Sequence, residues 1–546
     1  MFCTTPSLNG ASPLAPIFLA GPIAAISGQD SGDIQVLERR CCTVPGASGN
    51  VRPPVTVAGS GKHGFGIPRM QTHWIVMKFG GTSVAGRQQW DAIASLARER
   101  QAEGWRVLLV CSAVAGVTNR LTALADDPSV ETSLNELIDR HRSLSRELGV
   151  DERHWLARAT TLLQECLDGL RKEPGPPARA ALLAAGEWLS TQIGCLFMRG
   201  QGLDTTWVDA REALAALSEP DLSPARQWLS ASCAAGADDA LESLWSGLGP
   251  VLITQGFIAR SQDGRTALLG RGGSDTSAAL LAGRLRSQRL EIWTDVPGLF
   301  SADPRLVPQA RLLHEVDYAE ALEMAASGAR VVHPRCIRAA AETQTPLWIK
   351  DANRPAIEGT RIAAGANAAN GIKTVTCQRD MAVMLLQNVD ARRQVGFLAG
   401  VFDVFRRRGI SIDLVATSET TTTVAINKES NHLSRAELET LAADLAPLCT
   451  VQRFDDCVCV NLVGRGARTA LSRMQPALRL FDQRPLLMVS QSANDLCLSL
   501  LVLAGDHEPL LKAAHAVLIP SGEAAVFGSS WASLQSGGGA AIGGTS

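Results

Sequence analysis

The sequence predicts an α/β protein: a first domain with a mainly parallel sheet covered on both faces, followed by two smaller α+β units. Three observations predict it. Short apolar runs alternate with helix-like stretches from Trp74 to about residue 360. After a turn-rich segment, the order of strand-like and helix-like stretches changes, and the new series then occurs twice. Alternating strands and helices are typical of a parallel sheet with helices on both faces.

The composition excludes several classes of protein. The 546 residues are 46% hydrophobic and 19% charged with a net charge of −2, which gives no reason to expect a nucleic-acid or membrane partner. The apolar stretch Leu496 to Ala504 is among the longest and is too short to span a bilayer. The 13 cysteines are scattered and form no C-x-x-C pair, which indicates reduced thiols rather than a metal site. We therefore expect a cytoplasmic protein.

The first domain is expected over residues 73–360. Strand-like runs occupy 74–79, 106–114, 250–259, 290–296 and 345–350, and helices are expected after Gly86, at 274–286 and at 318–326. Residues 1–72 are rich in Pro, Gly, Ser and Thr, which predicts a disordered extension or a start codon placed before the true start, near Met70 or Met77.

The second region begins after a linker expected at residues 361–376. A β-α-β-β-α series over 377–447 is followed by a second copy over 448–521. Val415-Ala-Thr-Ser418 and Val489-Ser-Gln-Ser492 occupy matching positions in the two copies. Such units pair edge to edge, so small-ligand sites are plausible at their interface. Residues 522–546 are expected to form a disordered tail.

The stretch WIVMKFGGTSVA, residues 74–85, ends a buried strand on a lysine and two glycines. Open α/β sheets bind ligands at the carboxyl ends of their strands. Gly80 and Gly81 let the backbone approach an anion, and Thr82 and Ser83 offer hydroxyls and amides where a helix begins. With Lys78, this stretch predicts a phosphate cradle.

A second glycine-rich turn, LLGRGGSD, combines Arg271 with Ser274 and Asp275, which are expected to cap a helix. Two such turns in one sheet suit phosphoryl transfer to an anionic acceptor. A third element, WTDVPGLFSADPR at 293–305, is a loop after a strand, as a nucleotide base and ribose need.

The motifs KFGGTS, SAVAGVTN, GEWLS, QGFIA, GRGGSD and WTDVPG…DPR occur in this order, and together they resemble the aspartate kinases of the amino acid kinase family. The resemblance spans about residues 74–520. It implies a three-layer α/β/α kinase domain and two ferredoxin-like βαββαβ ACT domains. It also implies ATP-dependent phosphorylation of the L-aspartate β-carboxylate to 4-phospho-L-aspartate, with Mg²⁺ as cofactor and no metal held by the protein itself.

The resemblance assigns roles to individual residues. Lys78 is expected to steady the γ-phosphoryl group, Asp275 to orient Lys78, Arg271 to bind the substrate α-carboxylate and Glu187 to hold the α-amino group. The remaining aspartate contacts are expected at Thr118, Phe257 and Ser274. Nucleotide contacts are expected at Lys78, Gly80, Gly81, Thr82, Ser83, Thr294, Asp295, Phe300, Arg305 and Arg330.

Two positions depart from the family. It commonly has tyrosine at Phe300, so a hydroxyl contact is lost, and lysine at Arg330, where arginine changes reach and geometry.

The first small unit resembles that of lysine-sensitive aspartate kinases through GFLAGVF, residues 396–402, and DLVATSE, residues 413–419. Lysine is therefore the expected effector, and threonine is the alternative because Gln394 replaces a usual serine. The effector contacts are expected at Gly396, Phe397, Leu398, Asp413, Ser418 and Glu419. A homodimer or higher homo-oligomer is expected through the ACT domains.

Three alternatives remain open: another amino-acid carboxylate kinase of the same fold, a catalytically inactive ligand sensor, and the kinase part of a fusion with diaminopimelate decarboxylase. The pairing of Glu187 with Arg271 favours a free α-amino acid substrate.

Overall fold

The computed structural model describes residues 73–127, 131–329, 331–366, 370–388, 395–479, 482, 485–520 and 522–536. All of them belong to the unit formed by residues 70–546. The extension of residues 1–72 lies outside the described residues, as do Arg330 and Gln394.

A mainly parallel sheet forms the centre of the first domain. Within the described ranges, eight strands join it in the order β3-β4-β2-β1-β7-β10-β11-β9. Neighbours from β3 to β10 are parallel, β11 pairs antiparallel with β10, and β9 is parallel to β11. The bounds are β1 (Trp74–Phe79), β2 (Arg106–Cys111), β3 (Thr205–Trp207), β4 (Val251–Gln255), β7 (Arg289–Thr294), β9 (Glu315–Val316), β10 (Leu347–Asp351) and β11 (Thr360–Ile362).

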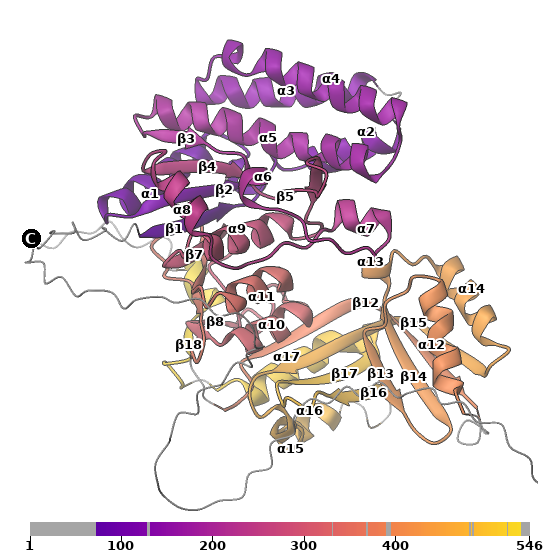
Figure 1. Cartoon of the computed structure of the whole chain (residues 1–546). Helices are drawn as coiled ribbons and strands as arrows, with labels where there is room; N and C mark the ends of the chain where they lie inside the picture. Colours follow the sequence, from indigo (N-terminus) through magenta and orange to yellow (C-terminus); the bar gives the residue numbers. More distant parts are fainter. Residues whose placement is uncertain are drawn as a thin grey trace, which may run out of the picture. The chain divides into compact units, whose positions relative to one another are not determined.

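Helices cover both faces of this sheet, as predicted (Figure 1). Alternate residues of β1 point to opposite faces: Ile75 and Met77 join a core with one set of helices, and Trp74 and Val76 join a core with the other. The first set is α1 (Arg87–Ala102), α2 (Val117–Asp126), α3 (Glu131–Leu148), α4 (Leu156–Lys172) and α5 (Pro176–Gly200). The second set is α8 (Asp239–Ser246), α9 (Gly273–Arg284), α10 (Tyr318–Ala326) and α11 (Pro334–Glu342).

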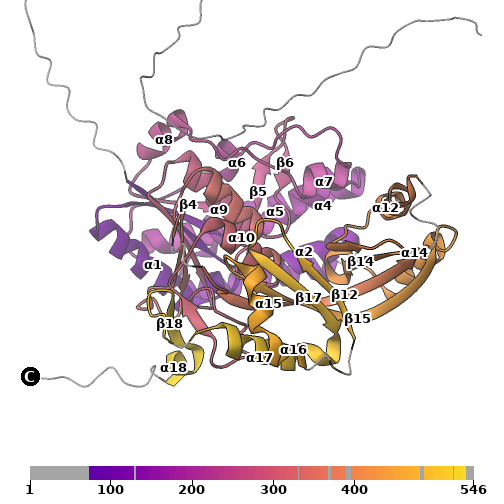
Figure 2. The ribbon, with the colours of Figure 1, turned by 90° about the horizontal axis from the view of Figure 1, so that it is seen from below.

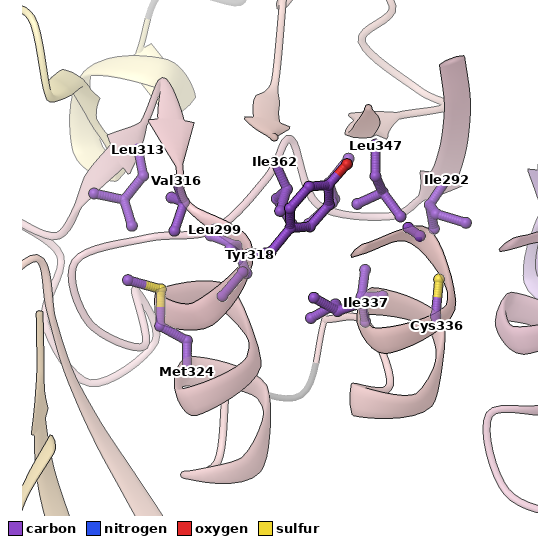
Figure 3. Packing of buried hydrophobic residues seen from close by; sticks show 14 of the residues in the cluster. Ile292, Leu299, Leu313, Val316, Tyr318, Met324, Cys336, Ile337, Leu347 and Ile362 are labelled. Carbon is purple, nitrogen blue, oxygen red and sulfur yellow. The ribbon is translucent and has the colours of Figure 1, made fainter. Parts of the chain in front are cut away.

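The packing of α10 and α11 against the sheet is shown in Figure 3. Tyr318 and Ile337 lie against strand residues such as Ile292 and Leu347, and all four are buried. The Tyr318 hydroxyl donates a hydrogen bond to the Thr345 carbonyl at 2.6 Å, which satisfies the one polar atom of its side chain.

The run 250–259, expected as one strand, is divided in two. β4 ends at Gln255 and a hairpin of β5 (Ile258–Arg260) and β6 (Thr266–Leu268) begins after Phe257, whose φ is 70°. Short helices α6 (Ala210–Ala213) and α7 (Pro224–Leu229) lie beside this hairpin. The break places Phe257 in a conformation that few non-glycine residues adopt.

The second region is built on another sheet. Six described strands form it in the order β13-β14-β12-β15-β17-β16, and all the pairings are antiparallel. The strands are β12 (Thr374–Gln387), β13 (Leu414–Thr417), β14 (Thr421–Asn427), β15 (Thr450–Val463), β16 (Leu486–Gln491) and β17 (Cys497–Leu503). The helices are α12 (Phe397–Arg407), α13 (Lys428–Asn431), α14 (Arg435–Leu445), α15 (Ala470–Arg473), α16 (Gln475–Leu478) and α17 (His507–Leu518).

The two copies of the strand–helix series are joined differently from the prediction. The second half of β12 pairs with β14 and with the start of β15, whereas its first half pairs with the end of β15. Both strands therefore run through both units, and Thr374–Gln378 completes the second unit although it precedes the first in sequence. The expected boundaries at 376/377 and 447/448 are corrected accordingly.

The tail expected at 522–546 is also corrected in part, because residues 527–536 are folded. β18 (Phe527–Ser530) pairs antiparallel with β8 (Arg311–Leu313) (Figure 1). Figure 2 shows α18 (Trp531–Ser536), which follows β18. Phe527 is 2% exposed, so the segment has an apolar anchor that its Gly- and Ser-rich neighbours hide in the sequence.

The two regions share one hydrophobic cluster, which includes Leu299 of the first region and Val375 and Leu462 of the second. A buried ion pair joins them at the same place: Lys373 Nζ lies 2.6 Å from Glu320 Oε2, and the two side chains are 2% and 0% exposed.

α5 is the one helix in the described ranges whose length and apolar composition would suit a membrane span. Its most apolar window is 83% buried inside the fold, which is what the central helix of a globular domain shows. The sequence expectation that no apolar stretch is long enough overlooked this helix.

Candidate active site

The first glycine turn lies at the carboxyl end of β1, against the loop after β2. The Gly81 carbonyl accepts a hydrogen bond from the Ala115 amide at 3.1 Å. A Cβ at Gly81 would lie 2.7 Å from the Ala113 carbonyl oxygen, a distance that real side chains do not reach. Glycine is therefore required here for close approach of two backbones. Ser83 is buried and Thr82 is exposed at the entry to the following 3₁₀ turn.

The second glycine turn brings Asp275 to Lys78. The Lys78 Nζ and Asp275 Oδ1 atoms are 2.5 Å apart, and the side chains are 12% and 14% exposed. Lys78 lies near the end of β1, and Asp275 lies in the first turn of α9. Contrary to the expectation of two turns in one sheet, α9 follows the separate β5–β6 hairpin. The structure brings these two predicted residues together, and their roles stay predictions.

Helix α9 is not capped as expected. Its N-cap is Gly272, at φ +66°, and no side chain caps it, so Ser274 and Asp275 lie inside the first turn. A Cβ at Gly272 would lie 2.3 Å from His333, and a Cβ at Gly273 would lie 2.5 Å from the Phe257 ring. The glycines allow the turn to pack tightly and leave the Asp275 carboxylate available to Lys78.

Glu187 lies on α5 with only 3% of its surface exposed. Burial raises the pKa of its carboxyl group to about 8, although hydrogen bonds from the Ala113 and Glu187 amides act in the opposite direction. Glu187 Oε2 is buried and accepts no hydrogen bond from the described residues. Since Ala113 also abuts Gly81, the carboxyl group lies next to the first glycine turn.

The other residues predicted for aspartate lie on neighbouring elements. Phe257 donates its backbone N–H to Ser277 Oγ at 2.9 Å, and a Cβ at Gly256 would lie 2.7 Å from Ser274 Cβ. Thr118 is half-buried on α2, which packs against α5. Arg271 is different: it is 70% exposed and its Nη2 lies 3.3 Å from Glu429 Oε1 of α13, in the second region.

A cavity of about 890 Å³ lies beside the loop after β7. The predicted nucleotide residues Thr294, Asp295, Phe300 and Arg305 all line it, whereas Lys78 and Asp275 do not. Arg305 is 85% exposed and pairs with Asp303 at 2.9 Å, which holds its guanidinium near the rim. Sequence analysis did not identify Trp531 of α18, which lines the same cavity.

A model of the amino acid kinase family matches residues 73–351, the domain that carries both glycine turns and most of the residues that line the cavity. The chain belongs to the amino acid kinase family. Its relatives include lysine-sensitive aspartokinase 3 of Escherichia coli, 30% identical over 81% of this chain and 99% of that protein. The chloroplastic aspartokinase 3 of Arabidopsis thaliana is 28% identical over 81% of this chain and 80% of its own length.

Two solved structures of E. coli aspartokinase III resemble this amino acid kinase over its second region as well. The complex with aspartate and ADP, called the R-state, has a TM-score of 0.68 at 28% identity and covers 82% of this chain and 100% of that chain. The complex with lysine and aspartate, called the T-state, has a TM-score of 0.67 at 28% identity and covers 82% and 99%.

The residues predicted to bind an effector lie on the first unit of the second region of this family member. Asp413 Oδ2 accepts the Asn427 N–H at 2.7 Å, and its side chain is exposed. Gly396, at φ +89°, is the N-cap of α12, and Leu398 in the first turn of that helix is 40% exposed. Ser418 and Glu419 are exposed in the turn between β13 and β14.

Proposed function

We propose that this chain is an aspartate kinase that transfers the γ-phosphoryl group of ATP to the β-carboxylate of L-aspartate. The observation that carries the proposal is the ion pair of Lys78 and Asp275 between two glycine turns, with the buried carboxyl group of Glu187 beside the first turn. The aspartokinase relatives extend over most of the chain, which supports the same substrate.

Phosphoryl transfer mainly requires that the acceptor carboxylate is aligned with the γ-phosphoryl group and that charge is neutralised, because the carboxylate is already a nucleophile. Lys78 stabilises the charge on the transferring group, and Asp275 holds the ammonium at one position. The amides and hydroxyls of Gly80, Gly81, Thr82 and Ser83 face the phosphates.

Mg²⁺ binds in proteins through one or two carboxylates together with substrate phosphates. Asp275 offers one carboxylate beside Lys78, which suits an ion that is otherwise held by the phosphates of ATP. When bound, it neutralises charge on the phosphates.

Aspartate is held by its α-amino and α-carboxylate groups. Glu187 receives the ammonium, and Thr118, Phe257 and Ser274 complete the pocket. Arg271 binds the α-carboxylate. A guanidinium has five N–H donors, and the contact with Glu429 joins one of its nitrogens to one carboxylate oxygen at 3.3 Å, so both carboxylates can be bound together. The nucleotide occupies the cavity lined by Thr294, Asp295, Phe300 and Arg305. The resemblance also assigns Arg330, which lies outside the described residues, to the nucleotide.

Substitution of Lys78 tests the catalytic assignment. Lys78→Ala is expected to lower kcat by at least about a hundredfold, because preorganised charge of this kind is worth a few kcal/mol. Lys172→Ala, an exposed lysine on α4, is the control and is expected to keep wild-type turnover. Activity is measured with aspartate and with glutamate as acceptor, with the melting temperature recorded for each variant. Near-normal turnover of the folded Lys78→Ala variant refutes the catalytic assignment of Lys78. A wild type that prefers glutamate to aspartate is another carboxylate kinase. A wild type with no turnover is a ligand sensor.

We further propose that the two βαββα units are ACT domains, that they bind lysine, and that a homodimer forms through them in the cytoplasm. The E. coli relative is described as lysine-sensitive and its T-state complex contains lysine. Asp413 meets the ammonium end of lysine, while Gly396, Phe397, Leu398, Ser418 and Glu419 receive its amino-acid end. Inhibition follows if lysine binds an inactive arrangement more tightly than the active one.

Asp413→Ala is expected to raise the lysine concentration for half-inhibition by at least about tenfold, because a charge-assisted hydrogen bond is lost. Turnover without lysine should stay within about twofold of wild type. Asp403→Ala on α12, a carboxylate of the same unit paired with Arg406, is the control. The measurement is a lysine titration at subsaturating aspartate, with threonine in parallel. Unchanged inhibition of the Asp413 variant, or inhibition of the wild type by threonine alone, contradicts the lysine site.

A further inference from the structure

The folded C-terminal segment, residues 527–536, is held to the kinase domain by specific contacts. Arg311 on β8 donates three hydrogen bonds to backbone carbonyls, to Pro520 at 2.8 Å, Phe527 at 2.7 Å and Gly528 at 3.1 Å. Its guanidinium also lies 5.2 Å from the centre of the Phe527 ring. One arginine therefore fixes both the approach to β18 and the strand itself, and α18 begins at a defined position.

Trp531, the first residue of α18, is held in that position from three directions. Its backbone N–H donates to the Ala310 carbonyl at 2.8 Å. Its ring meets Phe300 edge to face, with centroids 5.4 Å apart and planes at 84°. The guanidinium of Arg354 lies 5.3 Å from the Trp531 ring, and Arg354 is in turn bound to the buried carboxylate of Asp351 at 2.8 Å.

The indole also lines the cavity that contains the predicted nucleotide residues. Phe300 lines the same cavity, together with two cations, Arg305 on the loop after β7 and Arg379 on β12. The carboxylates of Asp295, Asp303 and Asp380 line it as well. A cavity that offers aromatic rings and cations fits a molecule with a flat base and phosphates.

We propose that Trp531 is a nucleotide-binding residue, and that residues 527–536 complete the ATP site by placing its indole against the purine base. This inference rests on the proposed aspartate kinase function, which places ATP in this cavity. Phe300 and Trp531 form one aromatic corner, in which each ring restricts the other, so little side-chain freedom remains to be lost when the base binds.

Three full-length variants test the proposal. Trp531→Ala removes the ring, Trp531→Phe keeps an aromatic face, and Gln535→Ala changes an exposed residue of the same helix as the control. Trp531→Ala is expected to raise the ATP KM and the ADP Kd by about five- to tenfold, because an aromatic contact of this kind is worth about that factor. The aspartate KM and kcat at saturating ATP should stay within about twofold, and Trp531→Phe should recover most of the affinity.

A purely structural role is separated by two further measurements. The melting temperature of each variant shows whether the segment still folds, and ADP titration is followed by tryptophan fluorescence in the wild type and in Trp531→Phe. A ring in contact with the base should give the wild type an ADP-dependent signal that the phenylalanine variant lacks. Identical ADP titrations of the two proteins, or unchanged ATP KM and ADP Kd in Trp531→Ala, overturn the role of Trp531 and leave the kinase assignment standing. A wild type that does not bind ADP overturns both.

Discussion

Glu187 offers a test in which stability and substrate binding move in opposite directions. The carboxyl group is 3% exposed, Oε2 accepts no hydrogen bond from the described residues, and burial raises its pKa from 4.5 to about 8. At pH 7 the folded protein therefore holds a proton on Glu187 that the unfolded chain has released. Glu187→Gln has the same shape as the protonated carboxyl group and needs no proton.

The sign of the effect follows from the proton count. Between pH 4.5 and about 8 the folded state binds more protons than the unfolded state, so the contribution of Glu187 to stability falls as pH rises through this window. Each pKa unit corresponds to about 1.36 kcal/mol, so the loss at pH 7 is about 3 kcal/mol. Glu187→Gln should recover about that amount at pH 7 and almost nothing at pH 4.5.

Substrate binding should respond in the opposite way. An ammonium group beside Glu187 favours the ionised carboxylate, so aspartate binding releases close to one proton below pH 8. The aspartate KM should fall about tenfold per pH unit up to about pH 8 and then level off. In Glu187→Gln the KM should be raised at least about tenfold at pH 8 and lose this pH dependence.

The assay combines urea unfolding at pH 5, 7 and 8 with aspartate titrations at the same pH values. Proton release is read from calorimetric enthalpies in buffers of different ionisation enthalpy. Glu173→Gln, an exposed carboxylate at the end of α4, is the matched control. A Glu187 variant that is no more stable than wild type at pH 8 refutes the raised pKa. A variant that is stabilised but binds aspartate normally refutes the contact with the ammonium.

Two other predictions concern ion pairs that join the two regions. Arg271→Ala should raise the aspartate KM at least about tenfold and leave kcat within a few-fold of wild type, because a charged hydrogen bond to the α-carboxylate is lost. A rise in the ATP KM with an unchanged aspartate KM would show instead that the two subsites are reversed. Lys373→Met should lower the free energy of unfolding by about 3–5 kcal/mol, because it leaves the fully buried Glu320 without its cation. The double variant Lys373→Met/Glu320→Leu should regain most of that stability in chemical denaturation, and equal losses in the single and double variants would show that the pair is not coupled.

The parts of the fold that follow from local pattern were predictable. β1 is an apolar run with one lysine, Lys78, and its apolar residues are buried. On α1, Trp90, Ile93, Ala94 and Ala97 face the hydrophobic core, as their spacing indicates. α14 begins at a capping box of Ser434 and Glu437, which a short window of sequence contains.

Long-range pairing was not predictable in the same way. Thr374–Gln378 pairs with the end of β15, more than 80 positions later, and no local pattern distinguishes this arrangement from two consecutive units. Similarly, the resemblance of the GRGGSD motif placed Arg271 at the substrate, and that motif does not indicate the contact with Glu429, which lies on α13 of the second region.

The candidate site shows the same division. The resemblance of the motifs KFGGTS and GRGGSD to those of aspartate kinases predicted that Asp275 lies at Lys78, and the two side chains are in contact. The expectation that both glycine turns follow strands of one sheet was wrong, because α9 follows the β5–β6 hairpin. The position of Trp531 could not be predicted from the sequence, because it depends on Arg311 binding the backbone of residues more than 200 positions away. The sequence of residues 522–546 lacks hydrophobic periodicity, and its composition predicts disorder. Arg311, which donates to three carbonyls, and the buried Phe527 contribute to ordering ten of these residues, and an aromatic ring, Trp531, thereby lines the nucleotide cavity.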